Sequence, residues 1–225
     1  MEQLGLIHTV SRLAPTFAEL TDELLPEVET TVIADELLLK ETVRDGSVGA
    51  ATTERLRGHA DALFAFGVDA VLVTCSSLGT VVDAIAAGSE KPVLRVDRPM
   101  AQRAVALGST VGVLATLPTT LAPTTDLVGK CARDMERAVE VVPRLCPDAF
   151  ASLQRGDSAR HDEIVATELE RLAETVDVVV LAQASMARIA AGIPDDGTPI
   201  LSSPRSAIEH VAEGFADLEA EADPR

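Results

Sequence analysis

The sequence predicts an α/β protein made of two pseudo-symmetric halves, each with a doubly wound parallel sheet. Two observations lead to this prediction. Short runs of Val, Ile and Leu alternate along the chain with helix-length segments, and the order of motifs in the first half recurs in the second. Strands that are apolar on both faces are typical of a parallel sheet that helices cover on both sides.

In the first half, a helix that Thr52 or Thr53 can cap is expected to run to Phe66, because Gly67 is a typical C-terminal stop. A second helix is expected over about residues 78–87, where Gly88 ends it. Short apolar runs predict the strands of this half, which are Leu4–Val10, Val28–Ile33, Val68–Thr74 and Pro92–Val96.

The second half continues the alternation of strands and helices. Its expected strands are Thr110–Ala115, Val139–Val142, Asp177–Ala182 and Pro199–Leu201, and a loop around Pro143 and Pro147 follows the second of them. Its expected helices are Pro99–Leu107, Thr119–Arg133 and Ser158–Thr175, and a last helix begins at Pro204. Right-handed crossovers place the carboxyl ends of all strands at one edge of a sheet, where ligands bind.

Three pairs of segments indicate an internal duplication. Gly5–Thr9 matches Gly112–Thr116 at an offset of 107 residues, Val68-Asp69 matches Val176-Asp177 at 108, and Pro92–Leu94 matches Pro199–Leu201 at 107. Any two βαβ units look somewhat alike, but a constant offset over three segments favours duplication. We therefore expect one half in residues 1–97 plus 206–225, the other in residues 98–205, and the site in the cleft between them.

Composition excludes several classes of partner. The formal net charge of −17 and the absence of Trp and Tyr argue against nucleic-acid binding. No apolar run approaches the roughly 20 residues that a membrane helix needs, and the N-terminus carries no basic leader, so we expect a cytoplasmic protein without a membrane partner. Three cysteines without metal-type spacing predict free thiols and no metal site. The sequence allows a homo-oligomer.

Cys75 is the first candidate for chemistry. It follows the strand Val68–Thr74 and precedes a helix, whose N-terminal dipole favours the thiolate. A buried cysteine can also be a simple packing residue. Ser76 and Ser77 can cap the helix or, together with Thr74, bind an anion.

The duplication gives the second set of candidates. Gln183 stands 108 residues after Cys75, and an amide can form hydrogen bonds but cannot act as a base. Ser185 behind it either caps a helix or binds substrate. His8 ends the first strand, which should neighbour the third, so it is a candidate base or counter-charge for Cys75. The hydroxyl groups expected to bind substrate or cap helices in these segments are Thr9, Thr116, Thr119 and Thr120.

These motifs resemble the aspartate/glutamate (hydantoin) racemase superfamily, near its maleate isomerase and arylmalonate decarboxylase branches. The resemblance is carried by TCSS after VDAVLV, by GVLATLPTT and by PVL, and it covers nearly the whole chain. It implies two doubly wound halves around one site, no cofactor, and a cysteine after the inner strand of each half. The first cysteine carries over to Cys75, whereas Gln183 replaces the second. His8 falls where glutamate racemases have an acidic residue.

The resemblance leaves three functions open. The first is a one-cysteine isomerase or lyase that acts on a small carboxylate, although the decarboxylases of the superfamily keep the cysteine of the second half. The second is a racemase of an amino acid or similar substrate in which His8 or a water held by Gln183 completes the pair. The third is a carboxylate-binding member that has lost turnover. Arg95 and Arg98 are the candidate cations for such an anion.

Overall fold

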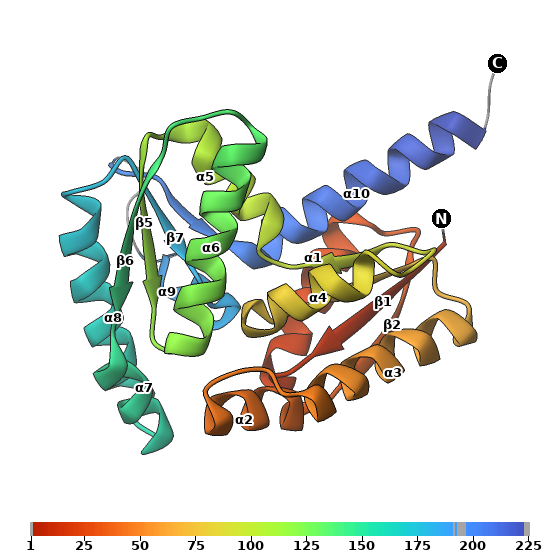
Figure 1. Ribbon diagram of the computed structural model, residues 1–225, viewed down its shortest axis with the longest axis horizontal. Coiled ribbons are helices and arrows are strands. Elements are labelled where there is room, and N and C mark those ends of the chain that lie inside the picture. The colour runs from red at the N-terminus through yellow and green to blue at the C-terminus, as the bar shows by residue number, and fades with distance from the viewer. Residues whose placement is uncertain (1, 191, 193–196, 223–225) are drawn as a thin grey trace. The chain divides into compact units, whose positions relative to one another are not determined.

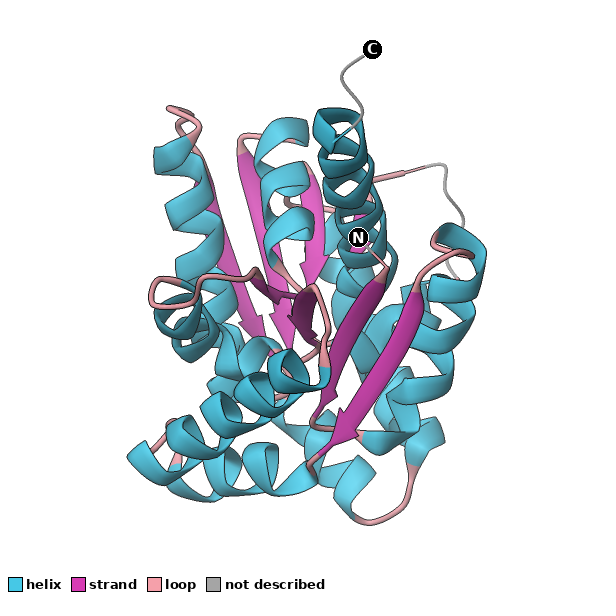
Figure 2. Ribbon diagram, turned by 90° about the vertical axis from the view of Figure 1, so that its right-hand side faces the viewer, coloured by secondary structure: helices cyan, strands magenta, loops and turns pink. Residues whose placement is uncertain are grey.

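The computed structural model describes residues 2–190, 192 and 197–222, with side chains as far as residue 215. The chain forms two compact units: unit 1 comprises Met1–Val96 and Pro204–Arg225, and unit 2 comprises Asp97–Ser203. Both units contain parallel strands that lie between helices (Figure 2). Within the described residues, no helix has the length and apolar composition needed to cross a membrane.

Unit 1 contains a parallel sheet with the strand order β2-β1-β3-β4. Its strands are β1 (Gln3–His8), β2 (Glu29–Ala34), β3 (Ala70–Val73) and β4 (Val93–Arg95). Its helices are α1 (Ala14–Leu24), α2 (Glu36–Asp45), α3 (Ala50–Phe66), α4 (Gly79–Ala86) and α10 (Ser203–Ala222), of which the last begins at the boundary with unit 2. One apolar cluster joins the sheet to α2, α3 and α4, and another joins it to α1 and α10 (Figure 1).

Unit 2 repeats this plan with the parallel strand order β6-β5-β7-β8. Its strands are β5 (Thr110–Ala115), β6 (Glu140–Leu145), β7 (Val178–Leu181) and β8 (Ile200–Ser202). Its helices are α5 (Arg98–Leu107), α6 (Pro118–Asp134), α7 (Pro147–Gln154), α8 (Ser158–Ala173) and α9 (Ala187–Ala190). The helices α5 and α6 cover one face of the sheet, and α7, α8 and α9 cover the other.

The duplication extends to individual hydrogen bonds. The carboxylate of Asp69 accepts backbone N–H bonds from Glu2 and Gln3, at 2.7 and 3.0 Å. The carboxylate of Asp177 accepts the corresponding bonds from Ser109 and Thr110, both at 2.8 Å. Each pair of bonds lowers the pKa of its aspartate and ties the start of the first strand of that unit to the start of the third. The predicted α/β class with two parallel-sheet halves is thus confirmed.

Two helices of unit 1 were not predicted. The first is α1, which has a proline in its first turn. The second is α2, whose cap is Asp35: its side chain accepts the backbone N–H of Leu37 at 2.9 Å. Gly46, in the left-handed region at a φ of 71°, ends α2. The next helix, α3, starts at Ala50 with Gly49 as its cap, so the expected caps Thr52 and Thr53 lie inside its first turn.

Two prolines of unit 2, Pro143 and Pro147, lie in secondary structure and not in the predicted loop. Pro143 lies within β6, paired with Val113, instead of in a loop. This is permitted because β6 is an edge strand, where a missing N–H breaks no inner ladder. Pro147 opens the helix α7, a position where its missing N–H costs nothing.

Candidate active site

Six of the predicted site residues of unit 1 lie where β1 and β3 end. These two strands pair directly, with Ile7 opposite Val73, so the residues that follow them are neighbours at the carboxyl edge of the sheet. This confirms the expected adjacency of the first and third strands. The six are His8, Thr9, Thr74, Cys75, Ser76 and Ser77, and all are buried.

Hydrogen bonds fix the tautomer of His8. Thr74 Oγ1 lies 3.1 Å from the carbonyl of Ile7, which can only accept, so the one hydroxyl proton of Thr74 goes there. His8 Nδ1 lies 2.7 Å from the same Oγ1 and must therefore be the donor. In a neutral imidazole the lone pair is then on Nε2.

The environment of His8 favours this neutral form. Burial lowers the pKa of His8 from 6.5, and its ring packs on Phe17 with centroids 5.3 Å apart. Nε2 is buried and has no hydrogen-bond partner among the described residues. An unpartnered, buried nitrogen with a lone pair is a proton acceptor that is ready for a ligand.

Cys75 occupies the turn between β3 and α4. Its backbone is extended, and its carbonyl accepts the N–H of Leu78 at 3.2 Å, which starts the short 3₁₀ turn Ser76–Leu78. Its side chain joins the apolar cluster that contains Ile7 and Val73. Since side chains alternate along an extended segment, Thr74 and Cys75 point to opposite faces, and His8 pairs with Thr74. The Oγ of Ser76 is buried and unpartnered among the described residues.

The corresponding edge of unit 2 holds Gln183 in a fixed orientation. Gln183 Oε1 accepts the backbone N–H of Thr116 at 2.7 Å and the hydroxyl of Thr116 at 3.0 Å. Because a backbone N–H can only donate, the amide oxygen must face Thr116, which leaves the Gln183 NH₂ group as a donor for a ligand. Ser185 follows in the 3₁₀ turn Ala184–Met186 and is half-buried.

Helix α6 adds hydroxyl groups that sequence reasoning missed. Thr119 and Thr120 lie in its first turn, as predicted, and Thr124 and Thr125 lie one turn later. The Oγ1 atoms of Thr119, Thr124 and Thr125 are buried without a partner in the described structure. Pro123 has no N–H and cannot donate to the carbonyl of Thr119. The first two turns of α6 therefore hold a backbone carbonyl without its helical partner in addition to the buried threonine hydroxyls. The signal was the repeated triplet PTT in PTTLAPTT.

Three residues outside the motifs belong to packing. Cys131 lies in the apolar core of unit 2. Burial and the nearby Glu168 raise the pKa of Cys146 to about 11. His161 is buried near the start of α8, and its Nδ1 lies 2.7 Å from Asp162 Oδ1.

We predict that Cys75 is the most rapidly alkylated cysteine. It is 7% exposed, against 2% for Cys131 and 3% for Cys146, and the high pKa of Cys146 keeps that thiol protonated at neutral pH. Brief iodoacetamide treatment at pH 7, followed by peptide mass spectrometry, should label Cys75 first. Faster labelling of Cys131 or Cys146 would contradict the assignment.

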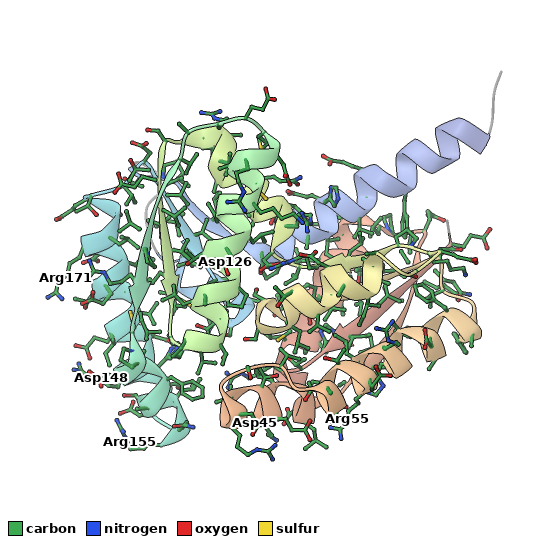
Figure 3. All side chains as sticks on the ribbon, viewed as in Figure 1. Asp45, Arg55, Asp126, Asp148, Arg155 and Arg171 are labelled. Carbon is green, nitrogen blue, oxygen red and sulfur yellow. The ribbon has the colours of Figure 1, made fainter. Side chains whose placement is uncertain are left out.

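A separate groove of about 450 Å³ lies between α7 and α8 of unit 2. None of the predicted site residues lines it. Its charges are largely internal pairs, Arg160 with Glu163 and Arg171 with Glu168, each at 2.6 Å. Arg155 and Arg171, which both line this groove, are labelled beside α7 and α8 in Figure 3. In the described part of the chain, no group of three His, Cys, Asp or Glu side chains could hold a metal ion.

Comparisons with known proteins agree with the fold. The family model described as "Asp/Glu/Hydantoin racemase" matches residues 8–211. The structure is similar to a glutamate racemase from Francisella tularensis solved with D-glutamate, with a TM-score of 0.74, 18% identity and coverage of 97% of this chain and 82% of that one. A glutamate racemase isoform from Bacillus anthracis gives a TM-score of 0.71 and 17% identity, with coverage of 96% of this chain and 82% of that one. The aspartate racemase of Picrophilus torridus gives a TM-score of 0.69 and 14% identity, with coverage of 95% of each chain. No curated protein matched.

Proposed function

Since the chain belongs to the Asp/Glu/Hydantoin racemase family, we propose that it is a cofactor-independent enzyme of the racemase and isomerase type. It acts on a small carboxylate or amino acid through Cys75. The observation that carries this proposal is that a buried thiol and a neutral, buried histidine follow the carboxyl ends of two paired strands, β3 and β1. His8 offers an unpartnered Nε2 there, and Cys75 stands one residue beyond the Thr74 that orients it.

The proposed step is a proton transfer at the carbon next to the carboxylate. The Cys75 thiolate removes the proton, the C–H bond breaks, and its electron pair delocalises into the carboxylate. Returning a proton from the thiol restores the carbon acid, and the same thiol can protonate a carbanion left by decarboxylation. His8 Nε2 is a second proton acceptor on the same unit.

Polar groups of unit 2 are proposed to bind the substrate. The Gln183 NH₂ group is a donor, and the unpartnered hydroxyl of Thr119 is near the start of α6, where backbone N–H groups favour an anion. In unit 1, the Ser76 hydroxyl and the turn before α4 offer the same chemistry. The proposed binding residues are Thr9, Thr74, Ser76, Ser77, Thr116, Thr119, Thr120, Gln183 and Ser185.

The test is solvent exchange on a panel of amino acids and small mono- and dicarboxylates. In D₂O, NMR should show loss of the α-hydrogen signal for at least one substrate, while ultraviolet absorbance follows unsaturated or malonate-type diacids. Binding of a dicarboxylate without exchange, absorbance change or turnover would overturn the proposal. It would favour the alternative of a carboxylate-binding member without activity. The observation behind that alternative is that unit 2 carries the amide of Gln183 where the family has its second thiol.

We predict that Gln183→Cys raises the rate of α-deuterium exchange or inversion. The substitution restores the second thiol of the family at the position equivalent to Cys75. Gln183→Ser is the matched control, because it also removes both bonds to Thr116 but adds no group that titrates near neutral pH. Both variants should lose about 1–2 kcal/mol of stability. A wild type that already inverts its substrate as fast as Gln183→Cys would contradict this role of Gln183.

A further inference from the structure

A buried arginine lies beside the Cys75 turn. Arg95 is the last residue of β4 and pairs in register with Val73, two residues before Cys75. Its side chain is only 3% exposed, and its Nη1 lies 2.9 Å from Asp83 Oδ2 on α4. Burying a guanidinium is costly unless it is paired, so this ion pair clamps the end of β4 to the first turns of α4.

The guanidinium packs against Gly79, the first residue of α4. A Cβ atom on Gly79 would fall on Nη2 and Cζ of Arg95 and would lie 2.9 Å from Nε. Gly79 has an ordinary helical backbone, with a φ of −54°, so glycine is not required there for conformational reasons. The space that Arg95 occupies explains the missing side chain.

Unit 2 provides an internal comparison. The strand pair β7–β8 places Ser202 opposite Leu181, as β3–β4 places Arg95 opposite Val73. The residue that corresponds to Gly79 in unit 2 is Ala187, the first residue of α9. Where the arginine becomes a serine, the glycine becomes an alanine, and the cysteine becomes Gln183. The Arg95–Asp83 ion pair therefore occurs in the unit that carries Cys75.

We infer that Arg95 is a positioning residue for Cys75. Held between Asp83 and Gly79, its guanidinium fixes the start of α4 and supplies a permanent positive charge beside Gly79, four residues after Cys75. A fixed positive charge favours the thiolate over the thiol. The inference takes Cys75 as the reactive thiol, as proposed above, but its test requires no turnover.

The experiment measures the rate of Cys75 alkylation by iodoacetamide against pH in the full-length chain. Arg95→Met should slow alkylation at pH 7 by up to about tenfold and shift the curve to higher pH, because loss of a nearby positive charge raises the pKa of a thiol by about one unit. Arg95→Lys should restore most of the rate. Lys91→Met is the matched control: Lys91 donates to the carbonyl of Val68 at the opposite end of the same strand pair, so its curve should not shift.

A second variant covers the case in which Arg95→Met fails to fold. Gly79→Ala with Arg95→Ser installs the pair that unit 2 itself uses, and it should fold yet show the same slow alkylation. An unchanged curve in folded Arg95→Met or in the Gly79→Ala, Arg95→Ser double variant, or an equal shift in Lys91→Met, would overturn the inference. If the curve follows Arg95 but no substrate exchanges, the inference stands and the proposed function fails. If substrate turns over but the pH dependence of Cys75 alkylation is the same with and without Arg95, the proposed function stands and the inference fails.

Discussion

Replacing Cys75 by alanine should abolish α-proton exchange and any turnover, with a loss of about 10³-fold or more, since no other thiol can take its place. The fold should survive, because the side chain removed is small and still 7% exposed at the end of a strand. Exchange rate is the first readout, and thermal unfolding followed by circular dichroism is the second.

The matched control is Cys131→Ala, which removes a more deeply buried thiol from the core of unit 2. It should lower the melting temperature at least as much as Cys75→Ala while leaving exchange unchanged. Comparable turnover in Cys75→Ala and the wild type would rule out a cysteine mechanism. A loss in the control as large as that in Cys75→Ala would show that stability, and not chemistry, sets the rate.

His8→Gln should lower the exchange rate about 10²- to 10⁴-fold, the range typical of a lost acid–base group. Glutamine keeps a polar side chain but cannot accept a proton from a substrate or a thiol. His161→Gln is the control, since it removes the other buried histidine, which lies in unit 2 and not in the unit that contains Cys75. It should leave the rate unchanged.

The pH profile separates chemistry from structure. Burial lowers the pKa of His8 below 6.5, so the folded protein keeps His8 neutral at a pH where the unfolded chain begins to bind a proton. The stability that this group contributes is present above pH 6.5 and is lost as the pH falls through the lower, folded pKa. Wild-type exchange should persist somewhat below pH 6.5 and then fall, and His8→Gln should lack this acid limb. An identical acid limb in the variant would exclude His8 as the second proton acceptor.

Much of the fold could be predicted because the signals are local or periodic. Strands buried on both faces appear as runs such as Val178–Leu181, and the duplication fixes their order. The helix α2 was missed although Asp35, its cap, and Gly46, its stop, flank it. The edge strand β6 was cut short at Pro143, because its tolerance for proline depends on its place in the sheet.

That the candidate residues of unit 1 lie at one sheet edge could be predicted, but their contacts could not. The adjacency of His8 and the third strand follows from sheet topology, whereas the Thr74 bond that sets the tautomer depends on side-chain geometry. Gln183 was recognised as a non-base, but its bond to the backbone of Thr116 joins residues far apart in sequence. Likewise, the reason for a glycine at position 79, at the start of α4, is the side chain of Arg95 on β4, which a Cβ atom there would meet. That both units serve one substrate stays a prediction.

The acid–base groups of unit 1 are proposed to act on one face of the substrate carbon. The most direct test gives each enantiomer of an exchanging substrate separately to the wild-type enzyme in D₂O. Deuterium incorporation is followed by NMR and inversion by chiral chromatography. We predict that one enantiomer exchanges with retention, faster than it inverts, because Gln183 presents only an amide. Inversion as fast as exchange from both enantiomers would contradict this central claim.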